Sequence, residues 1–263
     1  MAVGFTGKYG KYLRPRGGVR VLSAAHCLTL MLLVGLTQNS LLAQMDTAAA
    51  TVTASVQFSE AAGKDQSNTT AHRSPVVVWL TAIDNPQPRP SEQKAFTMTQ
   101  QGTMFHPHLL VIPVGGTVVF PNKDPFFHNV FSLFNGRRFD LGLYQSGQSR
   151  SVVFNRTGVS YIFCDIHPQM GAVILALDTP YYGSADEHGK ISIPAVPAGI
   201  YTLHVWSEAA SADESQLLTR RVTVAQNSTT DLGTITIHVS TKMLSDHLNK
   251  FGENYDTHKP PAY

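Results

Sequence analysis

Three side chains that can bind a soft metal lie close together in the stretch "YIFCDIHPQM", which runs from Tyr161 to Met170. Cys164, His167 and Met170 follow one another at intervals of three residues. Alternate side chains of a strand lie on one face, so a strand over "SYIFC" directs the thiol of Cys164 into a core at the strand's end. The turn that follows brings the histidine and the methionine near the same point. The alternative is a buried cysteine that only packs as a small apolar side chain.

A fourth candidate ligand is His128 in "DPFFHNVF", which lies 36 residues before Cys164 between apolar segments. Two imidazoles, one thiolate and a weak thioether form the ligand set of a blue-copper electron-transfer centre. Structural zinc motifs carry paired cysteines, iron–sulfur clusters need several, and a c-type haem needs C-x-x-C-H. The chain has only 2 cysteines and no such motif. The predicted metal ligands for one copper ion are therefore His128, Cys164, His167 and Met170.

The same region resembles a cupredoxin. The matching residues run from "GGTVVFPNKDPFFHNV" through "GQSRSVVFNRTGVSYIFCDIHPQMGAVILAL", and the resemblance covers about residues 96–180. The short ligand loop is similar to that of amicyanin, whereas plastocyanin-type loops place the methionine further along. The resemblance implies a Greek-key β-sandwich, three in-plane ligands (His128, Cys164 and His167) and Met170 as the axial ligand. It also implies that Asn129 links the two ligand-bearing loops by hydrogen bonds and that His167 is the electron port.

The rest of the chain also favours β structure. Valine and threonine recur in short alternating runs separated by glycine and proline, and no segment with a helical period is long enough for an α/β fold. The stretch "RRFDLGLYQSGQSRSVVF" predicts a β-hairpin with "QSGQS" as its turn. The sequence therefore predicts an all-β protein.

A second, smaller sandwich is expected beside the first. The stretch "DEHGKISIPAVPAGIYTLHVW" resembles the carboxypeptidase-regulatory, transthyretin-like sandwich, and "ASVQFSE" and "SPVVVWL" match its opening strands. The cupredoxin-like region would then be inserted between residues 50–88 and 184–240, with a flexible tail at 241–263. The competing arrangement is two consecutive domains, with the N-terminal strands joining the cupredoxin sheet. Packing of Trp79 near Trp206 would support the insertion.

Residues 1–43 have the pattern of a signal peptide. The apolar run "VLSAAHCLTLMLLVGL" follows a segment with five lysines and arginines and no acidic residue. The stretch "SLLAQ" after it allows cleavage after Ala43. An uncleaved anchor helix is the alternative. Removing these residues leaves 15 basic against 18 acidic side chains and a single cysteine, Cys164. No basic surface for nucleic acid is expected. The predicted location is periplasmic or secreted, with no stable membrane span after cleavage.

Together these features predict an exported type 1 copper protein that carries single electrons between a redox donor and a redox acceptor. Protein side chains fill all four expected ligand positions, which leaves none for a substrate and argues against an enzyme. A copper carrier or sensor without a redox partner, and a copper-free binding module, are the alternatives. The chain also resembles proteins described as methylamine-utilisation proteins, but none of its residues indicates amine chemistry.

Overall fold

The computed structural model describes residues 1, 49–59, 74–84, 94–133, 136–240 and 248–255. Within these residues the regular elements are strands and one short helix, so the prediction of an all-β protein is confirmed. Apart from Met1, the expected signal peptide lies outside the described residues. None of the described helices is both long and apolar enough to cross a membrane.

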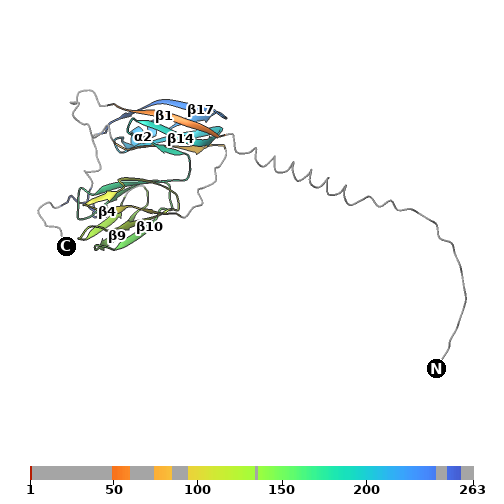
Figure 1. Ribbon diagram of the computed structural model, residues 1–263. Helices are drawn as coiled ribbons and strands as arrows, with labels where there is room; N and C mark the ends of the chain where they lie inside the picture. The colour runs from red at the N-terminus through yellow and green to blue at the C-terminus, as the bar shows by residue number, and fades with distance from the viewer. Residues whose placement is uncertain (2–48, 60–73, 85–93, 134–135, 241–247, 256–263) are drawn as a thin grey trace, which may run out of the picture. The chain divides into compact units, whose positions relative to one another are not determined.

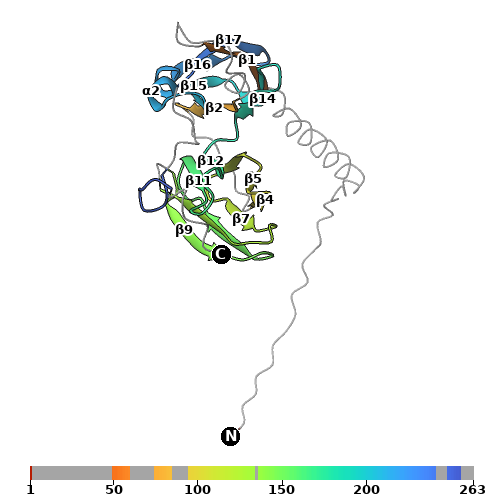
Figure 2. The same ribbon diagram turned by 90° about the vertical axis from the view of Figure 1, so that its left-hand side faces the viewer.

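Residues 95–177 form the first sandwich, which contains a five-stranded sheet, a three-stranded sheet and a separate hairpin. The five-stranded sheet has the order β6-β12-β11-β8-β9, the other has the order β10-β7-β3, and β4 pairs with β5. Figure 2 shows β11 and β12 next to each other. The strands are β3 (Ala95–Thr97), β4 (Thr99–Gln101), β5 (Met104–His106), β6 (Leu109–Pro113), β7 (Thr117–Pro121), β8 (His128–Ser132), β9 (Phe139–Tyr144), β10 (Ser149–Val153), β11 (Gly158–Phe163) and β12 (Gly171–Leu177).

The burial of these strands follows from their side-chain pattern. In β7 the alternating residues Val118 and Phe120 are fully buried, while their neighbours are partly exposed. In β12 almost every residue is buried: Ile174 belongs to the core of the first sandwich, and Leu175 belongs to a cluster that includes Trp206. A nearly continuous apolar run is typical of a strand covered on both faces. The sheet that carries the candidate ligands is therefore shielded from water at its centre.

The predicted hairpin over "QSGQS" is wrong. Its two strands exist, but β9 pairs with β8 in one sheet and β10 pairs with β7 in the other. Gly147 does occupy a turn with positive φ (76°), but its amide donates to the carbonyl of Asn122 at the end of β7. The chain therefore crosses between sheets at this turn, a choice that turn residues alone do not specify.

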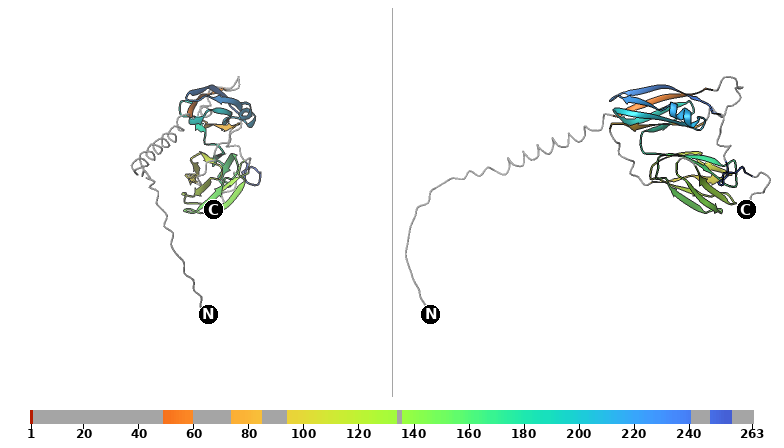
Figure 3. Two further views of the ribbon diagram at one scale, coloured as in Figure 1. Left: turned by 90° about the vertical axis from the view of Figure 1, so that its right-hand side faces the viewer. Right: turned by 180° about the vertical axis from the view of Figure 1, so that it is seen from behind.

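The second sandwich consists of strands from both ends of the described chain. Its sheets have the orders β14-β1-β17 and β13-β2-β15-β16, and β1 runs parallel to β17. Figure 1 shows β1, β14 and β17 side by side, and Figure 3 shows the short helix α2 (Ala212–Leu217), which packs against β15. The strands are β1 (Ala49–Ser59), β2 (Val76–Ala82), β13 (Tyr182–Ser184), β14 (Lys190–Pro197), β15 (Gly199–Ser207), β16 (Arg220–Val224) and β17 (Thr229–His238).

The core of the second sandwich joins residues that are far apart in the chain. Val52 and Leu80, which precede the first sandwich, share one buried cluster with Ile193, Leu203 and Ile235, which follow it. Among the described residues, neither β1 nor β2 pairs with a strand of the first sandwich. The domain limits expected from the sequence (50–88, 96–180 and 184–240) remain a prediction. The strand pairings described here bear on where these limits lie.

Candidate metal centre

His128 is placed by the pairing of β8 with its two neighbours. It is the first residue of β8, a strand in which every residue is buried. β8 runs antiparallel to β11, with Phe131 opposite Phe163, and His128 lies opposite Tyr144 of β9. The start of β8 therefore lies beside the residues that follow β11. This brings His128 close to Cys164 although 36 residues separate them.

The turn between β11 and β12 carries the other three predicted ligands. The amide of Cys164 donates to the carbonyl of Met170 at 3.3 Å, and the amide of Met170 donates to the carbonyl of His167 at 3.0 Å. These two hydrogen bonds close the turn. Met170 is fully buried and belongs to the same apolar core as Cys164. The main chain thus fixes all three residues within one short loop.

The side chains of His128, Cys164 and His167 converge. The sulfur of Cys164 lies 3.7 Å from Nδ1 of His128 and 3.5 Å from Nδ1 of His167. Their possible ligand atoms all lie within 4.8 Å of one another, and the three residues are buried. Of the four predicted metal ligands, the structure therefore brings these three together through their donor atoms, and it places Met170 in the core beside them.

These distances fit a single metal ion. Metal–nitrogen bonds of about 2.0 Å and a metal–sulfur bond of about 2.3 Å give sulfur-to-nitrogen edges of roughly 3.5 to 3.7 Å for angles between tetrahedral and trigonal. The two sulfur-to-nitrogen distances, 3.5 and 3.7 Å, lie in this range. One soft sulfur with two imidazole nitrogens is a donor set that suits copper. Both sulfur-to-nitrogen distances are therefore those expected around one ion of this size.

Main-chain amides surround the sulfur of Cys164, but they are not sufficient to stabilise a thiolate. Burial raises the pKa of the Cys164 thiol above its usual value, while hydrogen bonds from the main-chain amides of Asn129, Ile166 and His167 oppose that rise. The amides do not overcome the cost of burial, so the metal-free side chain stays protonated. A bound metal ion would supply the missing stabilisation, because a thiol that coordinates a metal ion loses its proton.

A carboxylate orients His128 from the side opposite the sulfur. Nε2 of His128 lies 2.8 Å from Oδ2 of Asp124, a side chain that is nearly buried. A carboxylate accepts hydrogen bonds, so Nε2 carries the proton and Nδ1 presents its lone pair toward Cys164. Histidines that bind metals commonly donate their other ring N–H to such a carboxylate. The structure therefore selects the tautomer of His128 that can bind a metal through Nδ1.

Asp124 is itself held by the turn between β4 and β5. The amides of Gly102 and Thr103 donate to its two carboxylate oxygens at 2.7 and 3.0 Å. Burial on its own raises the pKa of Asp124, but these two hydrogen bonds and the one from His128 outweigh it and bring the pKa below its usual range. The sequence alone indicates no role for Asp124. Its position four residues before His128 was the available signal, but its amide partners lie more than twenty residues upstream.

His167 presents a neutral ring to the sulfur of Cys164. Burial lowers the pKa of His167 below its usual value, and the neighbouring His128 lowers it further. Only 7 % of His167 is exposed. The ring of Phe126 lies 5.2 Å from that of His128 and 5.6 Å from that of His167, measured between centroids. One aromatic ring therefore contacts both imidazoles and limits the access of water to them.

Asn129 makes contacts that differ in part from those the resemblance implied. Its main-chain amide is directed at the sulfur of Cys164, which links the two ligand-bearing segments. Its side-chain amide donates instead to Oδ1 of Asp140 on β9, at 2.6 Å. The link between the two ligand-bearing segments therefore comes from the backbone of Asn129. Its side chain connects β8 to the carboxylate of Asp140 on β9.

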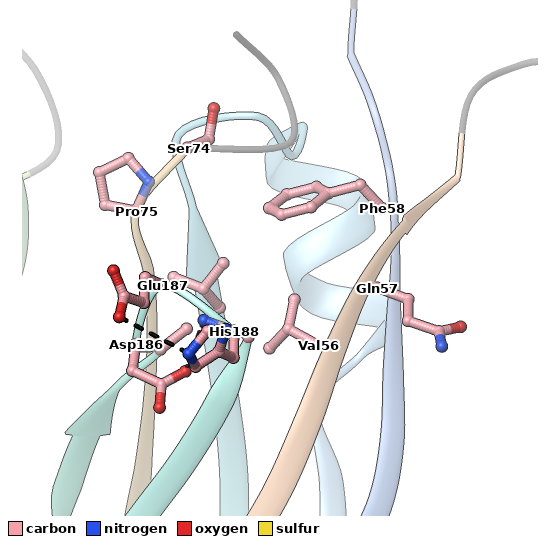
Figure 4. Close-up of a pocket in the computed structure, with 11 residues that line it drawn as sticks. Val56, Gln57, Phe58, Ser74, Pro75, Asp186, Glu187 and His188 are labelled. Atoms are coloured by element: carbon pink, nitrogen blue, oxygen red, sulfur yellow. Dashed lines mark hydrogen bonds and ion pairs between the residues drawn. The ribbon is translucent and has the colours of Figure 1, made fainter. Parts of the chain in front are cut away.

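A separate hollow of about 980 Å³ lies at one end of the second sandwich, near Phe58 of β1 (Figure 4). Its polar side chains hold a turn: Oδ1 of Asp186 accepts the amides of His188 and Lys190 at 2.9 and 2.8 Å. His188 also forms an ion pair with Glu187 at 3.6 Å. None of the residues that line this hollow belongs to the cluster of His128, Cys164 and His167.

Comparisons with known proteins give one family match and several similar solved structures. Residues 176–232 match the family model described as polysaccharide lyase family 4, domain II. The transthyretin-like resemblance of that region remains a prediction. No curated protein matches the sequence significantly.

Solved structures similar to this chain are mostly cupredoxins. A purple cupredoxin from Nitrosopumilus maritimus is 26% identical, with 31% of this chain and 99% of that chain covered and a TM-score of 0.29. A single-residue variant of amicyanin in its oxidised state is 20% identical, with 34% and 87% covered and a TM-score of 0.31. A copper-containing nitrite reductase from Thermus scotoductus SA-01 is 22% identical, with 46% and 28% covered and a TM-score of 0.32.

Proposed function

We propose that this protein is an exported type 1 copper protein that carries single electrons between redox partners. The observation that carries the proposal is the position of two Nδ1 atoms at 3.5 and 3.7 Å from one sulfur inside a buried site. In the proposed site His128, Cys164 and His167 would hold the copper ion, and the buried Met170 would be the fourth, weaker ligand. Copper bound by such ligands exchanges one electron between Cu(I) and Cu(II).

The residues of the chain favour rapid electron exchange because they are held in place before metal binds. Asp124 fixes the tautomer of His128, and the closed turn fixes Cys164 and His167. A site whose donor atoms move little between two metal states needs little reorganisation. The proposed ligand set also leaves no coordination position for a substrate, which favours a carrier over an enzyme.

Transfer of electrons to another protein requires a place where the site approaches the surface. His167 is the candidate, because it retains a small exposed area and lies in the loop with the exposed Pro168. Phe127, which is 36% exposed, belongs to the segment just before His128. We propose that a donor and an acceptor contact the protein near His167, in the periplasm or outside the cell.

We propose that the cupredoxin-like region is inserted in the sequence of the second sandwich, and that this sandwich serves as a scaffold or docking surface. Two facts support this arrangement. β2, which precedes the first sandwich, pairs with β15, which follows it. Trp79 of β2 stacks on His204 of β15, and Trp79 and Trp206 belong to the same apolar cluster. The sandwich would then span residues 50–88 and 184–240, with the cupredoxin-like residues 96–180 between them.

The test is the visible and EPR spectrum of the copper-loaded protein beside that of Cys164→Ser. The wild type should bind one copper ion, show the intense visible absorption of a copper–thiolate centre and undergo reversible one-electron reduction. Cys164→Ser should lose the colour because the sulfur ligand is gone. His188→Ala, which removes a histidine exposed on the second sandwich, is the control and should keep the colour.

Two other results would point to other functions. A colourless protein that holds only Cu(I) would indicate a copper carrier or sensor. A folded wild type that takes up no copper would indicate a copper-free binding module, and it would refute the proposed function.

A further inference from the structure

The segment of residues 248–255, here called the C-terminal strap, contacts the turn that carries the predicted ligands. The amide of Lys250 donates to Oδ1 of Asp165 at 3.0 Å, and the hydroxyl of Tyr255 donates to the carbonyl of Cys164 at 2.9 Å. The contacts join residues 85 and 91 positions apart in the sequence. From the sequence, this segment is expected to be part of a flexible tail without a role.

The strap has a defined local structure of its own. The side-chain oxygen of Asn249 accepts the amides of Phe251 and Glu253 at 2.9 and 3.0 Å. The amide of Asn249 donates to the carbonyl of Glu253, and that of Gly252 donates to the carbonyl of Asn249. Gly252 has a φ of 82°, a conformation that glycine adopts without strain. The segment is therefore a compact turn, and its geometry presents Lys250 to the ligand loop.

Lys250 connects both ligand-bearing segments. Its ammonium group lies 3.6 Å from Oδ2 of Asp165, next to Cys164, and 3.2 Å from Oδ2 of Asp140. Asp140 in turn accepts the side-chain amide of Asn129, the residue that follows His128. The Lys250 side chain is only 23% exposed, so water screens these charges less than on an open surface. One cation thus bridges two carboxylates, one next to Cys164 and one that accepts the side-chain amide of Asn129.

We propose that the C-terminal strap is part of the metal centre, with Lys250 and Tyr255 as positioning residues that hold the ligand turn closed. The part that concerns copper rests on the proposed function above; the contact with the ligand turn exists without metal. Tyr255 restrains the main chain at Cys164. Lys250 ties Asp165 to Asp140 and adds a positive charge near the site, and that charge disfavours the more positive Cu(II) state.

The first experiment uses the metal-free protein, so it does not depend on copper binding. Hydrogen exchange of peptides covering residues 160–172 is compared among the wild type, Tyr255→Phe and Lys250→Met. Loss of one ordinary hydrogen bond shifts a local opening equilibrium by about fivefold, so Tyr255→Phe should raise exchange in this turn by about that factor. The control is Tyr182→Phe, which alters an exposed tyrosine of β13 and should leave the turn unchanged.

The second experiment uses the copper-loaded protein. Release of copper to a chelator should be faster in Tyr255→Phe and Lys250→Met than in the wild type. The reduction potential should fall in Lys250→Met and stay near that of the wild type in Lys250→Arg, because arginine keeps the charge. A general loss of stability would not produce this difference between methionine and arginine.

The outcomes separate the strap from the proposed function. Exchange at residues 160–172 that is the same in the wild type, Tyr255→Phe and Lys250→Met would overturn the proposal. Equal potentials in Lys250→Met and Lys250→Arg would overturn the electrostatic role of Lys250. A wild type that binds no copper, combined with faster exchange in metal-free Tyr255→Phe, would refute the proposed function and still support the strap's hold on the turn.

Discussion

Replacement of Asp124 by asparagine should weaken metal binding in a protein that still folds. Oδ2 of Asp124 accepts hydrogen bonds from both Thr103 and His128, and Oδ1 accepts one from Gly102. Asparagine has one oxygen and one NH₂ group, so it cannot accept on both sides. If its NH₂ group faces Nε2 of His128, that nitrogen becomes an acceptor and the ring proton moves to Nδ1. The nitrogen that faces Cys164 then has no lone pair for a metal.

The size of the effect follows from the lost contact. A hydrogen bond to a charged group contributes about 1.5–3 kcal/mol. That range corresponds to roughly 10- to 100-fold in affinity, which is also the usual effect of altering a partner of a metal-bound histidine. We therefore expect Asp124→Asn to bind copper about 10- to 100-fold more weakly, measured by competition with a chelator of known affinity.

Asp186→Asn is the matched control. Like Asp124, Asp186 accepts hydrogen bonds from two main-chain amides of a turn, those of His188 and Lys190. Unlike Asp124, it is not hydrogen-bonded to the cluster of His128, Cys164 and His167. Both variants should lose stability from the altered turn, and only Asp124→Asn should lose copper affinity. Equal copper affinities in Asp124→Asn and Asp186→Asn would refute the argument that Asp124 selects the tautomer of His128.

Two further predictions concern other parts of the fold. Nδ1 of His108 lies 3.1 Å from the carbonyl of Gly171 and Nε2 lies 2.6 Å from Glu208, whose hydrogen bond raises the pKa of His108 above 6.5. This pair therefore stabilises the fold most below pH 6.5 and loses its effect as the pH rises through the folded-state pKa; an NMR titration should show the raised pKa in the wild type and a lower one in Glu208→Gln. Gly189→Ala should destabilise the protein more than Gly147→Ala in thermal unfolding. Both glycines have positive φ, but an added Cβ lies 2.8 Å from a carbonyl oxygen only at Gly189. Strain at positive φ alone costs about 1–2 kcal/mol, and equal losses would show that the second sandwich yields at this contact.

The sequence by itself was sufficient where contacts are local. Cys164 and His167 lie three residues apart on one turn, so their types and spacing predicted their closeness, and their donor atoms lie 3.5 Å apart. The all-β class followed from alternating apolar residues, because that pattern matches the period of a strand. His128 was predicted as a ligand from chemistry, because a metal bound by one thiolate and one imidazole on a short loop requires further ligands.

Only the tertiary structure decided the contacts between distant segments. Asp124 orients His128 because a turn at Gly102 lies against it, and the C-terminal strap reaches Cys164 across 91 residues. The strands on either side of "QSGQS" belong to different sheets, because β9 pairs with β8 in one sheet and β10 pairs with β7 in the other. Such contacts depend on which surfaces meet after the chain has packed. Separation along the sequence does not predict them, because the entropy lost in closing a loop changes only slowly with its length. Sequence spacing therefore identifies the predicted ligand turn, and packing determines which carboxylate, cation and hydroxyl group surround it.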